Sequence, residues 1–219
     1  MRRTALIIVI ALAACAIVYV PLRCHLMQDA APSEPVLVAG EACPPEVLAR
    51  LDEAGWRERV GEELGLWVSA GHQRLVGLRG GRVEFIHVCS TAARGLGGRE
   101  NSFQTPLGWH AIEEKIGAGQ PWGTIFIERK PVGKPWSPDQ PTEKDYVLSR
   151  ILWLRGLEPG VNQGKGFDSH DRYIYVHGTP AEGKLGTPAS MGCIRLSNDD
   201  VIALFDRVPS GTKLLITEW

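Results

Sequence analysis

The feature that most constrains the fold of this chain is a series of short, strand-like runs divided by loops rich in glycine and proline. Clear runs cover 66–69, 74–78 and 83–88, and Gly80-Gly81 between the last two is typical of a hairpin turn. Further runs lie at 123–127, 146–154, 173–176 and 214–217. Because helices of crossover length do not separate these runs, we expect a mainly β fold that is largely antiparallel and not of the βαβ type.

Helical periodicity is limited to two places in the domain. Before the strands, apolar residues at roughly helical spacing predict one or two short helices packed on the domain: Val47, Leu48, Leu51, Val60 and Leu64. Near the end of the chain, Ser197 and Asp200 have the spacing of a capping box. An apolar stripe follows it, and we therefore expect a helix over about 197–208.

The amino terminus predicts export and a membrane anchor. Met1-Arg2-Arg3 precedes an uncharged, almost wholly apolar run over 4–22, which as a helix would nearly cross a hydrocarbon core of about 30 Å. Cleavage near residues 11–14, or lipidation at Cys15, are alternatives that the sequence leaves open. We divide the chain into a signal anchor or signal peptide (1–27), a tether with a short helix (28–64) and a folded domain (65–219).

Charge and cysteine spacing exclude several kinds of site. The 24 basic side chains nearly balance the 25 acidic ones, so we expect no nucleic-acid partner. The cysteines form no C-x-x-C pair and no zinc-type cluster, and we expect neither a metal nor a cofactor. Export would permit a disulfide between Cys43 and Cys89. We expect a monomer.

Two residues near the end of the strand series have the chemistry of a catalytic pair. His177 ends a run of alternating aromatic and aliphatic residues, and Gly178 breaks that run, so the imidazole lies at a strand end beside a turn. Cys193 follows Gly192, whose missing side chain lets backbone N–H groups approach a reacting carbonyl. A free thiol is a weak nucleophile at neutral pH and needs a base or a positive charge nearby. The hypothesis is that His177 is that base.

The residues around this pair resemble a known family. His177-Gly178-Thr179, followed by Ser190-x-Gly192-Cys193-Ile194-Arg195, resembles the signature of the L,D-transpeptidase catalytic domain (YkuD). Upstream, Thr105-Pro106-Leu107-Gly108 and Asp168-Ser169 before Arg172-Tyr173 resemble further motifs of that family, in the expected order. The resemblance implies a YkuD-type β-sandwich with a helix after the active-site loop, so that 65–219 would be the catalytic domain.

The resemblance also implies a mechanism and a location. The cysteine, here Cys193, would attack the carbonyl of the third residue of a peptidoglycan tetrapeptide stem, release the terminal D-alanine, and pass the resulting thioester to an amine. His177 would be the base, the Gly178 carbonyl would orient its ring, and the N–H groups of Gly192 and Cys193 would hold the oxyanion. We expect a periplasmic enzyme held at the inner membrane by its amino-terminal segment. Substrate contacts are expected from three residues: Ser190, Thr179 and Arg195, the last with a bracing salt bridge as an equal alternative.

One residue departs from the family pattern. Met191 stands where the family usually has a histidine, and a thioether neither donates a strong hydrogen bond nor takes a proton. This leaves two alternatives open: an L,D-carboxypeptidase or endopeptidase that uses water as acceptor, and a catalytically weakened wall-binding module. The sequence also does not decide whether His170 reaches the site, or whether 129–145 is a lid over the cleft or an ordinary surface loop.

Overall fold

The computed structural model describes residues 36–140 and 142–219. The anchor predicted over 1–27, with its apolar run, and the cysteines at 15 and 24 lie outside the described residues. Within the described part, no helix is long and apolar enough to span a membrane.

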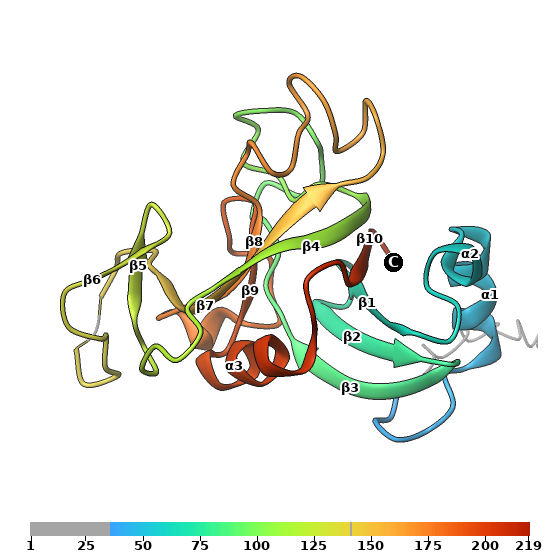
Figure 1. Ribbon diagram of the computed structural model, residues 1–219, viewed down its shortest axis with the longest axis horizontal. Helices are drawn as coiled ribbons and strands as arrows, with labels where there is room; N and C mark the ends of the chain where they lie inside the picture. Colours follow the sequence, from blue (N-terminus) through green and yellow to red (C-terminus); the bar gives the residue numbers. More distant parts are fainter. Residues whose placement is uncertain (1–35, 141) are drawn as a thin grey trace, which may run out of the picture. The chain divides into compact units, whose positions relative to one another are not determined.

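The domain is built mainly from ten strands that form one continuous hydrogen-bonded sheet (Figure 1). Eight of them follow the order β3-β2-β1-β10-β4-β7-β5-β6, and β8 and β9 branch from β7. Most pairs are antiparallel, and β1–β10 and β8–β9 are parallel. The mainly β fold is therefore confirmed. The strands are β1 (Leu64–Ser69), β2 (Arg74–Arg79), β3 (Arg82–Val88), β4 (Gly108–Ile116), β5 (Ile125–Ile127), β6 (Lys130–Val132), β7 (Val147–Gly156), β8 (Tyr175–Gly178), β9 (Ile194–Leu196) and β10 (Lys213–Thr217).

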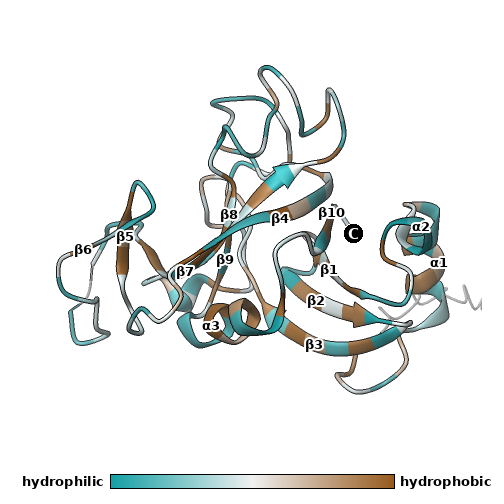
Figure 2. Cartoon of the chain, in the orientation of Figure 1, coloured by the Kyte–Doolittle hydropathy of each residue, from teal (hydrophilic) through white to brown (hydrophobic). Residues whose placement is uncertain are grey.

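The main core lies between the β1–β3 part of the sheet and the β7–β9 part. It collects inward-facing aliphatic residues of both parts, such as Leu66, Leu75, Leu152 and Val176, all fully buried. Figure 2 shows the alternation of hydrophobic and hydrophilic residues along β3 that such a half-buried strand requires. Burial of this apolar surface is the main driving force for the fold.

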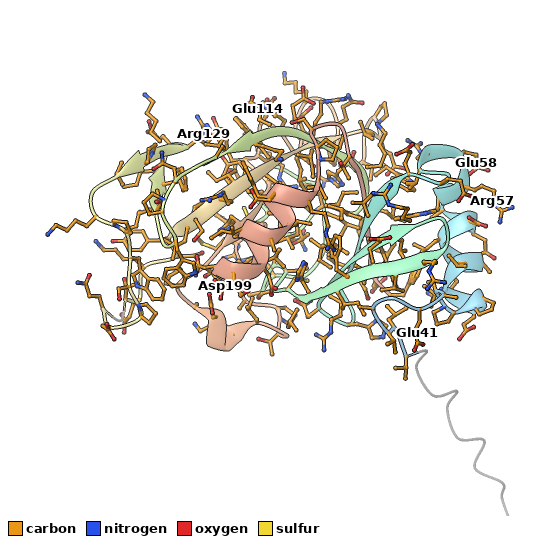
Figure 3. All side chains as sticks on the ribbon, turned by 60° about the horizontal axis from the view of Figure 1, so that its bottom comes forward. Glu41, Arg57, Glu58, Glu114, Arg129 and Asp199 are labelled. Atoms are coloured by element: carbon orange, nitrogen blue, oxygen red, sulfur yellow. The ribbon has the colours of Figure 1, made fainter. Side chains whose placement is uncertain are left out.

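Helix α3 (Asn198–Arg207) follows strand β9 and covers this core. The Ser197 side chain caps it by accepting a hydrogen bond of 3.0 Å from the backbone N–H of Asp200. Val201, Leu204 and Phe205 are the buried stripe that packs on the core. The predicted helix over about 197–208 is confirmed. Asp199, in its first turn, is labelled in Figure 3.

Two short helices pack on the other face of β1–β3. They are α1 (Pro45–Glu53), with its proline in the first turn, and α2 (Trp56–Arg59), and a 3-10 turn η1 (Glu182–Lys184) lies later in the chain. Trp56 packs with Trp109 of β4 at 5.7 Å between ring centroids. Arg57 and Glu58 point away from the sheet (Figure 3). The short helices expected before the strands are confirmed, and Figure 1 places them at the opposite end of the domain from the β5–β6 hairpin.

The disulfide suggested between Cys43 and Cys89 is wrong, because both are free, buried thiols. The backbone N–H of Cys43 bonds to the Gly81 carbonyl before β3, whereas Cys89 follows the far end of β3. An extended strand of this length separates them by about 25 Å, far beyond the Cα separation of about 4–7 Å that a disulfide spans.

Candidate active site

Strands β8 and β9 bring the predicted catalytic residues together. They pair in parallel with His177 opposite Arg195 and Val176 opposite Ile194. Side chains alternate along a strand, so the two residues at even positions enter the main core. The residues at odd positions share the opposite face: Tyr175, His177, Cys193 and Arg195.

This face opens into a cleft of about 380 Å³. Its walls include both members of the predicted pair, together with Met191 and Ser190 from the loop before Cys193 and Asp145 from the segment before β7. Several charged residues from distant parts of the chain also line it: Glu100, Asp145, Asp171, Arg172 and Arg195. The thiol and the imidazole therefore face one and the same cavity.

His177 is held in a single tautomer. The residue is only 3 % exposed, and Nδ1 lies 2.8 Å from the carbonyl oxygen of Gly178. A carbonyl oxygen can only accept a hydrogen bond, so Nδ1 carries the proton and Nε2 keeps its lone pair. Burial lowers the pKa of His177 to about 4, partly opposed by the bond to Gly178. The ring is thus neutral at physiological pH, and it is oriented by the Gly178 carbonyl, as the family resemblance implied.

Cys193 presents a thiol that is protonated at rest. Its Sγ lies 3.4 Å from the backbone N–H of Tyr175 and 3.4 Å from the carbonyl oxygen of Tyr173. Burial raises the pKa of the thiol to about 11, against a lowering contribution from the Tyr175 N–H and a smaller one from Arg195. The thiol is therefore not a preformed thiolate. Proton transfer to a neighbouring base has to accompany its attack.

Ser190 braces the active-site loop through its own hydroxyl. The Ser190 Oγ donates to the carbonyl oxygen of Cys193 at 2.6 Å and accepts from the backbone N–H of Gly192 at 3.2 Å. Both groups are committed within the loop, which differs from the expected substrate contact of Ser190 and oxyanion role of Gly192. Among the described residues, the backbone N–H of Cys193 has no hydrogen-bond partner, and it is the donor left for an oxyanion.

Glycines satisfy steric requirements at both ends of the pair. Gly192 has φ +130°, which a residue with a side chain rarely adopts. A Cβ on Gly178 would lie 2.5 Å from the Asn198 side chain and 2.9 Å from the carbonyl oxygen of Leu148.

Thr179 is fully buried and does not line the cleft, so the structure gives no support to its expected substrate contact. Met191 is 63 % exposed at the cleft wall.

Arg195 is fixed by strand pairing and by a salt bridge, the alternative that the sequence left open for it, although the sequence did not indicate Asp145 as the partner. Its backbone N–H and carbonyl both bond to Ser90 at 2.9 Å. Its guanidinium forms a salt bridge with Asp145, from the segment considered as a lid. Within 129–145, Asp145 is the described residue that lines the cleft. No local motif marks Asp145 as a partner, because 50 positions separate it from Arg195.

Two further residues, Arg172 and Thr105, support the site through partners that the sequence did not indicate. Arg172 donates to the carbonyl oxygens of Gly98 at 3.0 Å and Gln104 at 2.7 Å, and so ties a distant loop to the cleft wall. Thr105, fully buried, donates to the carbonyl oxygen of Gly192 at 2.9 Å. The threonine falls in a motif that resembled the family, but its partner could not be deduced from it.

His170 does not reach the cleft. Its ring stacks on Trp153 with centroids 3.9 Å apart, and it is not among the residues that line the cavity. His170 therefore does not take the place of the histidine that the family usually has at position 191. Within residues 36–140 and 142–219, no group of three or more His, Cys, Asp or Glu residues is placed to hold a metal ion.

Comparison with known proteins places this architecture. Residues 64–216 match the family model of the L,D-transpeptidase catalytic domain. A probable L,D-transpeptidase ErfK/SrfK of Salmonella typhimurium is 34 % identical over 123 residues, which cover 52 % of this chain and 40 % of that protein. The putative L,D-transpeptidase YqjB of Bacillus subtilis is 48 % identical over 56 residues, 24 % of this chain and 32 % of that protein.

The chain also aligns with solved structures. An L,D-transpeptidase from Mycobacterium smegmatis aligns with a TM-score of 0.44 at 19 % identity, covering 72 % of this chain and 59 % of that one. The chain spans less than half the length of the curated relatives it matches.

Proposed function

This chain belongs to the L,D-transpeptidase catalytic domain family, and from that premise we propose that it is a peptidoglycan L,D-transpeptidase with Cys193 as nucleophile and His177 as base. The observation that carries the proposal is the shared face of β8 and β9, where thiol and imidazole open on one cleft. The tautomer of His177 supports it, because the bond from Nδ1 to Gly178 leaves Nε2 free to take a proton.

The proposed first half-reaction forms a thioester. His177 Nε2 takes the Sγ proton as the sulfur attacks the carbonyl of the third residue of a tetrapeptide stem, and the Cys193 N–H stabilises the oxyanion. The C–N bond to the terminal D-alanine then breaks, and the imidazolium returns its proton to the leaving amine. The acyl group is left on Cys193.

The second half-reaction transfers the acyl group. An amine of a second stem attacks the thioester, His177 removes its extra proton, and the thiolate leaves and is reprotonated. A new amide bond links the two stems, and the enzyme returns to its neutral thiol and imidazole. Neither step needs a metal or a redox cofactor.

Incubation of the full-length chain with tetrapeptide muropeptides tests this proposal. We expect crosslinked dimers and released D-alanine, and we expect both to disappear in Cys193→Ala. A carbapenem should form one covalent adduct, which peptide mapping should place on Cys193 and not on the buried Cys43 or Cys89. Absence of an adduct in folded protein would remove the proposed nucleophile.

Met191, which is exposed, replaces the histidine usual in the family and leaves water open as the acceptor. The same reaction therefore also tests the hydrolytic alternative. Trimmed stems without dimers would show an L,D-carboxypeptidase, and cleavage of existing crosslinks an endopeptidase. Binding of stems without any turnover would show a wall-binding module. These products separate by chromatography of the same reaction.

We further propose that the protein acts in the periplasm as a monomer, held at the inner membrane by residues 4–22. The apolar character of that run supports the anchor. Membrane fractionation with carbonate extraction tests it: a peripheral or secreted protein would be released, and an anchored one retained.

A further inference from the structure

Two arginines, Arg172 and Arg195, line the cleft, and the terminal nitrogens of Arg172 are already used in hydrogen bonds within the protein. They donate to the carbonyl oxygens of Gly97 at 3.3 Å and Gly98 at 3.0 Å, and to Gln104 at 2.7 Å. Arg172 therefore binds the protein's own backbone. Arg195 is the remaining arginine on the cleft wall.

Arg195 is incompletely satisfied. Its Nη2 pairs with Asp145, but its Nε is buried and has no hydrogen-bond partner among the described residues. A guanidinium matches a carboxylate best when two of its nitrogens bind two oxygens, and a buried charge is costly when its donors stay unpaired. The side chain is 6 % exposed, so the solvent offers little compensation. A carboxylate that replaced Asp145 and bound two nitrogens of the guanidinium would satisfy Arg195 better than Asp145 does.

The two partners differ in how firmly they are held. The backbone N–H and carbonyl of Arg195 both bond to Ser90, and the strand that carries it, β9, pairs with β8. Asp145 lies in the segment between β6 and β7, where the backbone bonds nearest to it are local turns such as that of Tyr146 to Lys144 at 3.0 Å. The arginine is therefore a fixed point, and the aspartate is the partner that can be displaced.

The spacing along β9 suits the leaving end of a stem peptide. Cys193 and Arg195 are two positions apart on the same face, which puts their Cα atoms roughly 6.7 Å apart. In a peptide attacked by Cys193, the carboxylate of the terminal residue lies within about 4 Å of the attacked carbonyl carbon. A carboxylate at that position comes within reach of the Arg195 guanidinium.

From these observations we propose that Arg195 binds the terminal carboxylate of the donor stem, and that Asp145 occupies this place in the free protein as an intramolecular stand-in. This rests on the proposed function, since it takes the donor stem as substrate. Binding of the donor then exchanges one carboxylate for another on Arg195 and releases Asp145. The pair favours a donor with a free terminal carboxylate over one whose end is neutral.

The test measures binding without turnover, in full-length protein carrying Cys193→Ala. The probes are a disaccharide tetrapeptide ending in D-alanine and the same muropeptide ending in D-alaninamide, which keeps every other charge. We expect Asp145→Asn to lower the Kd of the free acid about fivefold, the scale of one partly exposed ion pair. The Kd of the amide should stay within about twofold, and Arg195→Gln should remove the preference for the acid.

Glu143→Gln is the matched control, because it removes the same charge from an exposed position of the same segment. Equal effects of Asp145→Asn and Glu143→Gln, or equal shifts for acid and amide, would overturn the inference. Melting temperatures show that each variant is folded, and the acid-to-amide ratio of the parent protein tests the carboxylate site independently.

The two proposals fail differently. Crosslinked dimers from protein with Cys193 intact, with no preference between acid and amide, would sink the carboxylate site and leave the transpeptidase standing. A preference for the acid without any turnover would support the carboxylate site and contradict the transpeptidase proposal. Binding of neither muropeptide would overturn both.

Discussion

The proposed catalytic pair rests as two neutral groups, which separates this thiol from cysteines activated as thiolates. Burial lowers the pKa of His177 to about 4 and raises that of Cys193 to about 11. At neutral pH an ion pair is disfavoured in the free protein, because both charged forms lose solvation in the cleft. In the proposed mechanism, charge separates only as the substrate carbonyl is attacked.

Alkylation of Cys193 should reflect this state. We expect the rate with iodoacetamide to be slow at pH 7 and to keep rising above pH 9, since a thiol with pKa about 11 is still largely protonated there. The measurement is a pH–rate profile by mass spectrometry, with Cys193→Ser to subtract reaction at other sites. A plateau below pH 8 would contradict the neutral resting pair.

Met191 offers a substitution that changes chemistry without changing packing. Its side chain is 63 % exposed at the cleft wall, so Met191→His should alter the free energy of unfolding by no more than about 0.5 kcal/mol. If Met191 biases the thioester toward water, the histidine variant should raise the ratio of dimers to hydrolysed stems. An unchanged ratio would show that this position does not select the acceptor.

At the scale of elements, the site depends on how the loop before β9 is held. Thr105 accepts from the Ala92 N–H at 2.9 Å and donates to the Gly192 carbonyl at 2.9 Å, so one hydroxyl joins two segments beside the nucleophile. Ser190 bonds the same loop from within. The position of Cys193 therefore depends on contacts outside β8 and β9.

Thr105→Val keeps the shape of the side chain and removes this link. It leaves a buried N–H and a carbonyl unpaired, and we expect a loss of about 2 kcal/mol in the free energy of unfolding together with slower acylation of Cys193. Urea denaturation and the rate of carbapenem adduct formation measure the two effects. Thr212→Val is the matched control: its hydroxyl bonds to Pro209, away from the cleft. The control should lose stability and keep the acylation rate.

At the scale of the whole molecule, two buried histidines link stability to pH. His110 bonds to the Ser169 hydroxyl at 2.9 Å, and burial lowers its pKa to about 4, as it does for His177. The unfolded chain takes up these protons below about pH 6.5, before the folded protein does. Their contribution is complete above that pH and is lost as the pH falls toward 4.

We therefore expect the free energy of unfolding to fall by about 4 kcal/mol between pH 7.5 and pH 5, about 2 kcal/mol from each histidine. Urea denaturation at the two pH values measures it. His110→Gln should lower stability at both pH values and halve the difference between them. A difference that is unaffected by this variant would show that other groups cause it.

Local patterns in the sequence determined the parts of this protein whose partners are close along the chain. The glycine turn between β2 and β3 and the Ser197 cap of α3 are each set by residues within a few positions. The sequence also placed a strand end at His177, but β8 continues through Gly178, which pairs with Leu148 and Leu196. The catalytic pair was predicted from such local features and from its resemblance to a family. The sequence did not predict strands β4, β6 and β9, because β6 and β9 are only three residues long and β4 carries exposed charges.

Tertiary structure alone decided what surrounds the pair. Asp145 meets Arg195 across 50 positions, Arg172 meets Gln104 across 68, and Thr105 meets Gly192 across 87. The two pKa shifts likewise arise from burial that only the packed sheet creates. Hydrogen bonds and desolvation depend on distance in space, and a sequence specifies that distance only through the fold as a whole.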